Sequence, residues 1–394
     1  MVKKHWKQQT RLVHEGQNRS PHGETAEAMY LTSGYVYDSA EQAEARFREE
    51  DDGFIYSRFG NPTVRAFEER MIALEGTQDA RATATGMAAV TATMMSQLQT
   101  GDHIVAARAL FGSCRYVVET LMPKFGVACT LVDGRDIDAW KAAIRPETKV
   151  LFLETPSNPL LEIVDMQAVA DLAHENGARL VVDNVFATPI LQRPTDFGAD
   201  IVVYSATKHI DGQGRCLGGV ILGDQSFIQD ELANFLRQTG PSLSPFNAWV
   251  MLKALETLAL RVDAHCHNAE KLTEFLVNHA QIERVYYPSH ASHPQHNLAM
   301  KQMSRGGNLI AFDVKGGKAN AFKFANALQI ALISNNLGDA KTLITHPATT
   351  THFKLDEAAK TELGITGGSM RVSIGLEDGD DLVHDFDQAL AQLA

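Results

Sequence analysis

The chain has 394 residues, of which 44% are hydrophobic and 21% charged, and its formal net charge is −12 at pH 7. This length and balance are typical of a globular protein with more than one domain and argue against a fibrous or disordered chain. The negative charge argues against nucleic acid and anionic membrane surfaces as partners, because both attract basic patches.

The cysteines and the N-terminus bear on the compartment. None of the four cysteines belongs to a C-x-x-C pair, which favours a reduced compartment and incidental thiols. Residues 1–19 begin with basic side chains but contain no apolar core, so no secretory signal is expected. No apolar run approaches the roughly 18 residues that would indicate a membrane-spanning helix. We therefore expect a cytoplasmic protein without a membrane partner.

Residues 1–60 are polar and irregular, with scattered aromatic side chains. A segment of this kind rarely packs on its own, so we expect an arm that contacts a neighbouring subunit. From Asn61 onward apolar residues recur at helical spacing until Gly76, which predicts a helix that ends at this glycine.

Beyond Gly76, short apolar runs alternate with amphipathic segments such as residues 165–176. Strands that alternate with helices predict an α/β fold with a mostly parallel, doubly wound sheet, and buried parallel strands are apolar on both faces. We assign residues 61–255 to this large domain. The predicted strands are residues 103–106, 128–132, 150–153, 180–182, 201–204 and 220–222.

A long helical stretch over residues 245–280 is expected to connect the large domain to a second one. The remainder of the chain, residues 256–394, is predicted to form a smaller α+β domain. Its predicted strands are residues 308–314 and 370–374.

Two charged side chains follow buried strands of the large domain. Asp183 ends the run 180–182, and Lys208 comes shortly after the run 201–204. Ligands of open α/β sheets bind beyond such strand ends, and burying either charge alone is costly. A cofactor with a basic ring nitrogen and an aldehyde would engage both, as pyridoxal 5'-phosphate (PLP) does in its enzymes. A structural ion pair between the two residues is the alternative that spacing leaves open.

A possible phosphate site precedes an apolar helix that starts near residue 86. Gly86 lets the backbone approach an anion, and a helix N-terminus offers free N–H groups. Ser205 and Thr207 would add hydroxyl groups to the same phosphate. Alone, one glycine before a helix is also typical of a plain helix cap.

Six segments, spread over nearly the whole chain, form a more specific pattern. They are YSRFGNPT (56–63), TGMAA (85–89), ETPSNP (154–159), VVDNVFATP (181–189), YSATKHIDGQGRCLGG (204–219) and SMRVSIGLED (369–378). Together they resemble the cystathionine γ-synthase-like, or Cys/Met metabolism, family of PLP-dependent enzymes. The resemblance implies a PLP-dependent transferase fold of the aspartate aminotransferase type, with PLP as cofactor, and a homotetramer built as a dimer of dimers.

The resemblance also implies roles for single residues. Lys208 matches the lysine that holds PLP as a Schiff base, and Asp183 matches the partner of its ring nitrogen. Gly86, Met87, Ser205 and Thr207 match the phosphate cup, which Tyr56 and Arg58 of a neighbouring subunit complete. Asn158 matches the residue near the ring hydroxyl and Arg371 the clamp of the substrate carboxylate; Ser334 and Asn158 are expected to help bind substrate.

Two segments bear on the substrate. Where the family often has a tyrosine against the cofactor ring, this chain has Phe111, which can stack but has no hydroxyl to donate a proton. An acyl ester needs no such acid, because its leaving carboxylate has a pKa of about 4 and is stable unprotonated at pH 7. Residues 334–352 resemble the version found in sulfhydrylases that use O-acylhomoserines. We therefore expect γ-replacement on O-succinylhomoserine by sulfide, in methionine biosynthesis.

Other functions stay open at this point. Within the family, a cystathionine γ-synthase would use cysteine as nucleophile, and an O-acetylhomoserine sulfhydrylase would use another ester. From a different class, a non-catalytic α/β assembly protein would keep the fold without the chemistry. The histidines at 290, 293 and 296 have a spacing that zinc uses, but Pro294 and polar neighbours favour a loop. No metal site is expected.

Overall fold

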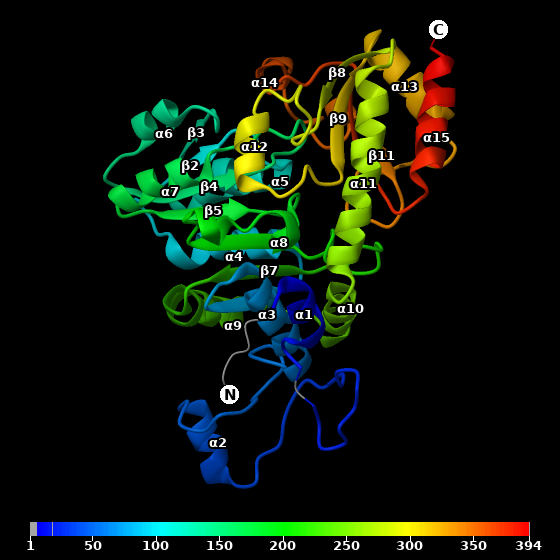
Figure 1. The fold of residues 1–394 in the computed structure, drawn as a ribbon. Coiled ribbons are helices and arrows are strands. Elements are labelled where there is room, and N and C mark those ends of the chain that lie inside the picture. Colours follow the sequence, from blue (N-terminus) through cyan, green and yellow to red (C-terminus); the bar gives the residue numbers. More distant parts are fainter. Residues whose placement is uncertain (1–5, 18, 394) are drawn as a thin grey trace.

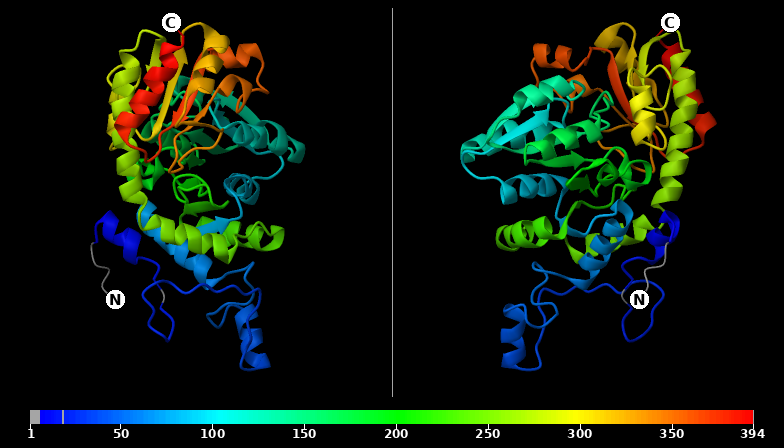
Figure 2. Two further views of the ribbon diagram at one scale, coloured as in Figure 1. Left: turned by 90° about the vertical axis from the view of Figure 1, so that its right-hand side faces the viewer. Right: turned by 60° about the vertical axis from the view of Figure 1, so that its left-hand side comes forward.

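The computed structural model describes residues 6–17 and 19–393. Two β-sheets with helices packed around them form the body of the protein, and the long helix α11 (Leu258–Val277) extends along both (Figure 1). Helix α2 (Ala40–Phe47) and the chain around it project away from this body in every view (Figure 2). Among the described residues, no helix has the length and apolar character required to cross a membrane.

The larger sheet has seven strands in the order β1-β7-β6-β5-β4-β2-β3. Strands β2 to β6 pair in parallel, whereas β7 runs antiparallel to both β6 and β1. The expected mostly parallel α/β sheet is therefore confirmed. Its strands are β1 (Asp79–Thr83), β2 (His103–Ala107), β3 (Ala128–Val132), β4 (Thr148–Glu154), β5 (Arg179–Asp183), β6 (Ile201–Ser205) and β7 (Gly219–Gly223).

Both faces of this sheet are buried under helices. Successive side chains of a strand point to opposite faces, and in β5 Leu180 and Val182 pack in one core while Val181 packs in the other. One core includes residues of α3 (Pro62–Glu75), α7 (Met166–Glu175) and α10 (Pro245–Leu255), and the other includes α4 (Gly86–Gln97) and α5 (Gly112–Tyr116). The remaining helical segments here are α1 (Gln8–His14), α6 (Ile137–Ala143), α8 (Thr188–Leu191), α9 (Ala233–Thr239), η1 (Val117–Leu121), η2 (Met122–Phe125), η3 (Pro194–Phe197) and η4 (Phe227–Leu232).

The smaller sheet has five strands in the order β10-β11-β12-β9-β8. Its core packs against α11, α13 (Gly317–Ala327) and α15 (Gly379–Ala391). The domain boundaries expected near residues 60 and 255 stay predictions; the two sheets take their strands from residues 79–223 and 282–373. The other elements are β8 (Ile282–Tyr286), β9 (Leu309–Val314), β10 (Leu332–Ile333), β11 (Leu343–Thr345), β12 (Ser369–Ser373), α12 (His296–Gln302), η5 (Pro347–Thr349) and α14 (Glu357–Glu362).

The stretch 245–280, expected as one helix, is two helices, α10 and α11, with a break at Glu256 and Thr257. The carbonyl of Ala254, near the end of α10, accepts the backbone N–H of Thr257 at 3.2 Å, Arg261 Nη2 at 3.0 Å and the Thr257 hydroxyl at 3.3 Å. A turn bond and two side-chain donors therefore take the place of the helical bond that a continuous helix would make here. The break lets α11 run in a different direction from α10, along the smaller sheet (Figure 2).

Candidate active site

A cavity lies at the carboxyl ends of β4, β5 and β6, with ≈ 960 Å³ of empty space, part of which is open solvent. Side chains from both sheets, from the start of α4 and from several loops line it. This is the place where ligands bind in open α/β sheets. Residues that line it include Gly86, Met87, Phe111, Glu154, Asn158, Asp183, Ser205, Thr207, Lys208 and Arg371.

The alternation of side chains along each strand decides which residues reach this cavity. In β5, Val181 and Val182 pack in opposite cores, so Asp183 returns to the side of Val181, where α4 lies. The same alternation along β4 and β6 places Glu154, at the end of β4, and Ser205, at the end of β6, on the α4 side of the sheet. Three polar strand ends therefore meet below the N-terminus of α4.

Asp183 is buried at the end of β5 and has few partners. Its Oδ1 accepts the N–H of Val185 at 3.1 Å, and the thiol of Cys114 lies 3.9 Å from its Oδ2. Burial raises the pKa of Asp183 to about 6. A cation placed against this carboxylate would stabilise its ionised form and lower that pKa again.

Lys208 lies in the loop that follows β6. Its Nζ donates a hydrogen bond to Asn336 Oδ1 at 2.5 Å. Burial lowers the pKa of Lys208 to about 8, and the charge of Arg371 acts in the same direction. An amine with a pKa near ambient pH exists in both protonation states, so it can act as a nucleophile and as a base.

The start of α4 forms a cradle for an anion. Thr85 caps the helix, because its Oγ1 accepts the N–H of Ala88 at 3.0 Å. A Cβ atom at Gly86 would lie 2.5 Å from the Cβ of Ser205, so only glycine lets the helix start this close to the end of β6. Thr207 stands nearby, with its hydroxyl bonded to the backbone of Gly218.

Arg371 extends into the same cavity from β12 of the smaller sheet and is 2% exposed. Its Nη1 donates to Asn158 Oδ1 and its Nη2 to the carbonyl of Asn335, both at 2.9 Å. Its Nε has no partner among residues 6–17 and 19–393. Burial lowers the pKa of Arg371 to about 10. A buried guanidinium with an unused N–H is well suited to an incoming carboxylate.

Aromatic and imidazole side chains complete the surroundings. Phe111, in the loop between β2 and α5, lines the cavity and is 37% exposed. Thr351 also lines it, and its hydroxyl is 2.8 Å from Nδ1 of the buried His352. Burial, together with the charge of Arg371, lowers the pKa of His352 to about 4. His352 is therefore a neutral hydrogen-bonding group at pH 7.

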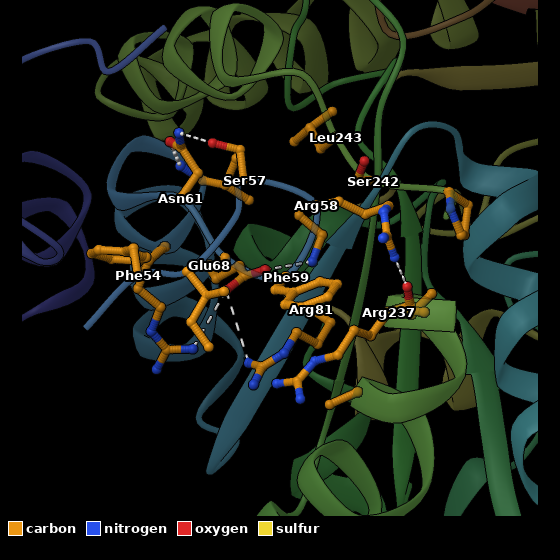
Figure 3. A pocket seen from close by; sticks show the side chains of 18 of the residues that line it. Phe54, Ser57, Arg58, Phe59, Asn61, Glu68, Arg81, Arg237, Ser242 and Leu243 are labelled. Carbon is orange, nitrogen blue, oxygen red and sulfur yellow. Dashed lines mark hydrogen bonds and ion pairs between the residues drawn. The ribbon is translucent and has the colours of Figure 1, made fainter. Parts of the chain in front are cut away.

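Three residues expected at the site do not line this cavity: Tyr56, Arg58 and Ser334. Arg58 lines a second cavity, where its Nη1 donates to the carbonyl of Arg237 and its guanidinium lies 4.8 Å from the centre of the Phe59 ring (Figure 3). The roles of Tyr56 and Arg58 concern a neighbouring subunit and stay predictions. The Oγ of Ser334 accepts the N–H of Asn336 at 3.2 Å, and the side chain of Asn336 in turn accepts from Lys208.

The sequence alone did not indicate roles for Asn336, Cys114 and Glu154. Asn336 lies 128 positions from Lys208, and no local pattern indicates that pair. Cys114 was expected to be an incidental thiol, although it is buried against Asp183. Glu154 could have been found, since counting side chains along β4 places it on the same face as Asp183.

The residues of this cavity fit PLP on four points. The backbone at Gly86 would hold a phosphate, Asp183 would face a protonated ring nitrogen, Lys208 would supply an amine for the aldehyde, and Phe111 would offer an apolar face to the ring. Arg371 would then be free for the carboxylate of an amino-acid substrate. Among the described residues, no group of His, Cys, Asp and Glu side chains could hold a metal ion.

Comparisons with known families and structures match nearly the whole chain. The family model described as Cys/Met metabolism PLP-dependent enzyme matches residues 9–391. An O-succinylhomoserine sulfhydrylase of Mycobacterium tuberculosis is 51% identical over 385 residues, which are 96% of this chain and 94% of that protein. An L-methionine gamma-lyase of Porphyromonas gingivalis is 40% identical over 386 residues, 98% of this chain and 97% of the other.

A solved structure also superposes on this fold. It is that of a putative O-acetylhomoserine (thiol)-lyase from Campylobacter jejuni, with a TM-score of 0.94 and 32% sequence identity, and it covers 98% of this chain and 100% of its own. That structure contains N'-pyridoxyl-lysine-5'-monophosphate. A lysine joined to the cofactor in this neighbour agrees with the chemistry of the cavity described above.

Proposed function

Because the chain belongs to the Cys/Met metabolism PLP-dependent enzymes, we propose that it converts O-succinyl-L-homoserine and hydrogen sulfide to L-homocysteine and succinate. This γ-replacement would serve methionine biosynthesis in the cytoplasm. The family, the fold and the PLP cofactor expected from the sequence are confirmed. The substrate pair and the roles of single residues are the proposal.

One observation carries the proposal: Lys208, Asp183 and Arg371 share a cavity that Phe111 also lines, at the position where the family often has a tyrosine. The first three groups suit any amino-acid chemistry with PLP, whereas the phenylalanine narrows the leaving group to one that needs no acid. The higher identity to the sulfhydrylase (51%) than to the methionine lyase (40%) supports the same choice.

Arg371 and Asn158 would bind the substrate before any bond changes. When bound, PLP supplies an electron sink that stabilises negative charge at the substrate Cα. Asp183 holds the proton on the ring nitrogen, since a carboxylate beside that atom favours its cationic form. Arg371 pairs with the α-carboxylate through its free N–H, while its bond to Asn158 fixes the guanidinium plane.

Lys208 would move the protons. With its pKa lowered to about 8, a useful fraction of the amine is neutral near pH 8, and this form takes the proton from Cα. Once it has passed this proton on, the amine takes a proton from Cβ, and a Cβ–Cγ double bond forms as the Cγ–O bond breaks with its electron pair and succinate leaves. Hydrosulfide then forms the Cγ–S bond, one proton returns to Cβ, and Lys208 returns the proton to Cα. Phe111 has no proton to donate to the leaving group. No proton donor is needed there, because succinate leaves as the carboxylate.

A rate comparison on the purified protein with PLP tests this function. O-succinyl-L-homoserine is supplied with sulfide or with cysteine, and homocysteine and cystathionine are quantified. We expect faster formation of homocysteine. Faster formation of cystathionine would make the protein a synthase that uses cysteine. If O-acetyl-L-homoserine, supplied in a parallel assay with sulfide, reacts faster than the succinyl ester, the proposed acyl group is wrong.

The proposal includes a homotetramer made of two dimers, in which the arm reaches a neighbouring site. The exposed large apolar side chains of the arm include Leu31 (66%), Val36 (93%) and Phe47 (65%) in the single chain. Exposed apolar groups gathered on a projecting segment are typical of a surface covered by a partner. Arg58, whose Nη1 donates to the backbone carbonyl of Arg237 in the single chain, would then bind the phosphate in the neighbouring cavity.

Mixed oligomers test the shared site. Arg58→Ala and Lys208→Ala variants are each expected to be inactive as pure oligomers. When they are mixed and allowed to exchange subunits, one site of each mixed dimer has both residues intact, so activity should return. Failure of the mixture to regain activity, with exchange verified by mass, would place Arg58 in the site of its own chain.

A further inference from the structure

Glu154 is a buried acidic residue that the proposed mechanism does not use. It ends β4, is 2% exposed and lines the cavity. In the parallel pairing of β4 with β5, it lies directly beside Asp183. Two carboxyl groups side by side in a buried place repel each other when both are ionised, so this arrangement costs folding free energy.

The chain uses both oxygens of Glu154 for backbone hydrogen bonds. Oε2 accepts the N–H of Phe111 at 2.6 Å, and Oε1 accepts the N–H of Asn158 at 3.2 Å. Phe111 comes from the loop after β2 and Asn158 from the loop after β4, and both line the cavity. One side chain therefore joins two loops that are separate in sequence.

Through Asn158, the same side chain reaches the smaller sheet. The side-chain oxygen of Asn158 accepts from Arg371 Nη1 at 2.9 Å, and Arg371 belongs to β12. Burial and the neighbouring Asp183 carboxyl raise the pKa of Glu154, and the two N–H bonds oppose this. A neutral apolar residue at position 154 would avoid the repulsion with Asp183. The contribution of Glu154 to the site therefore lies in its two hydrogen bonds to the backbone.

We propose that Glu154 is a positioning residue, which holds the backbone of Phe111 and Asn158 and so sets where the aromatic ring meets the cofactor and where Arg371 meets the substrate carboxylate. It touches no reacting atom. This inference rests on the proposed function only for the choice of substrate in the activity assay, because its other readouts concern the bound cofactor and a simple amino acid.

The variant Glu154→Gln tests the proposal with the PLP-loaded protein. Glutamine has the same shape but one acceptor oxygen, so its NH₂ group meets the N–H of Phe111 or of Asn158 and one bond is lost. We expect the L-homoserine concentration that half-saturates the absorbance change of the cofactor to rise about tenfold, as does KM for O-succinyl-L-homoserine. The visible circular dichroism per bound cofactor should change, while cofactor content stays near one per chain.

Asp385→Asn is the matched control. Asp385, in α15, is also buried, and it accepts the N–H groups of Gln329, Ile330 and Ala331; none of these residues lines the cavity. We expect this variant to lower Tm without moving KM, half-saturation or dichroism. If Glu154→Gln does the same, Glu154 is a structural residue only and the proposal is wrong; unchanged behaviour of Glu154→Gln in every assay would also overturn it.

A double-variant cycle separates the two loops. If Glu154 acts through Asn158, then Glu154→Gln combined with Asn158→Ala should raise the half-saturating L-homoserine concentration by less than the product of the single effects. If the two effects on the half-saturating concentration multiply in full, Glu154 does not act through Asn158. Should Glu154→Gln not fold, Glu154→Asp, which is one methylene shorter, serves in the same assays. Absence of turnover by the unsubstituted protein would refute the proposed substrates and leave the spectral readouts of Glu154 intact.

Discussion

Two buried aspartates in different regions show how this chain treats charge. Asp385, in the layer over the smaller sheet, accepts three backbone N–H groups. Asp183, at the cavity end of the larger sheet, accepts one N–H and otherwise faces a thiol. The backbone of the chain therefore supplies the hydrogen-bond donors that Asp385 needs. It supplies fewer donors to Asp183.

The same difference holds for the other charged groups of the cavity. Arg371 has an unused Nε, and the ammonium group of Lys208 donates to a neutral amide oxygen. Buried polar groups normally have their hydrogen-bond partners, so groups that lack them indicate either strain or a place prepared for a ligand. Several incompletely paired charges around one cavity favour the second explanation, and removing them should affect function more than stability.

The largest expected effect comes from Lys208→Ala. Turnover should fall at least about 1000-fold, because the amine acts both in cofactor attachment and in proton transfer. The cofactor-free protein, by contrast, should keep or raise its Tm, since a buried amine with a lowered pKa is removed. Thermal unfolding of PLP-free samples, beside the sulfide assay, measures both. A large loss of Tm would show that Lys208 belongs with the groups that stabilise the fold.

Asp385→Ala is expected to have the opposite pattern, a loss of stability without a loss of turnover. The variant leaves three N–H groups without their acceptor, so we expect a loss of about 3 kcal/mol in the free energy of unfolding. Urea titration followed by far-UV circular dichroism gives the value. Turnover per folded protein should stay unchanged, because α15 lies outside the cavity lining. Reduced turnover at full cofactor content would end the distinction between the two aspartates.

Glu75 is an exception to the rule that incompletely paired buried charges lie around the active-site cavity. It is buried in α3 and its Oε1 lacks a partner within the described chain, yet it lines neither the active-site cavity nor the cavity beside Arg58. Burial raises its pKa from 4.5 to about 7, and its Oε2 accepts from Tyr204. Its contribution to stability is complete below pH 4.5 and is lost as pH rises to about 7, because the unfolded state ionises first.

Glu75→Gln should remove this pH dependence. Relative to the unsubstituted protein, the variant is expected to gain about 3 kcal/mol of unfolding free energy between pH 4.5 and pH 8. Denaturant titrations at several pH values test this, with Glu69→Gln on the same helix as the control. A difference that stays constant with pH would mean that Glu75 is already ionised in the folded protein.

The sequence predicted the parts of the fold that follow from hydrophobic pattern. Strands β2 to β7 are mainly apolar runs, so each was expected close to its position. The edge strand β1 was missed, because Asp79, Arg81 and Thr83 interrupt its apolar residues. The break between α10 and α11 was missed as well, since it depends on Arg261 reaching back to a carbonyl.

The site was predictable where it follows strand ends and motifs. Asp183 and Lys208 stand at the ends of apolar strands, and their meeting follows from parallel neighbours in a sheet. The bond from Lys208 to Asn336 and that from Arg371 to Asn158 join different sheets. Contacts of this kind depend on how the two sheets pack, which no periodicity in one sequence contains.

The smallest effect is expected from Phe111→Tyr, which adds to the cavity a proton donor that the chain lacks at this position. Turnover of O-succinyl-L-homoserine with sulfide should change less than about threefold, because a leaving carboxylate needs no acid at neutral pH. A thiolate leaving group does gain from one, so release of methanethiol from L-methionine should rise above that of the unsubstituted protein. Phe111 is 37% exposed, which leaves room for the hydroxyl.

Phe125→Tyr, at a half-exposed position in η2 that lines no part of the cavity, controls for adding a hydroxyl elsewhere. It should leave both activities as they are. If Phe111→Tyr loses ester turnover tenfold and gains no methanethiol release, Phe111 serves only to pack against the cofactor. The absence of an acid would then have no bearing on the substrate, and the preference for an acyl ester would depend on residues 334–352 alone.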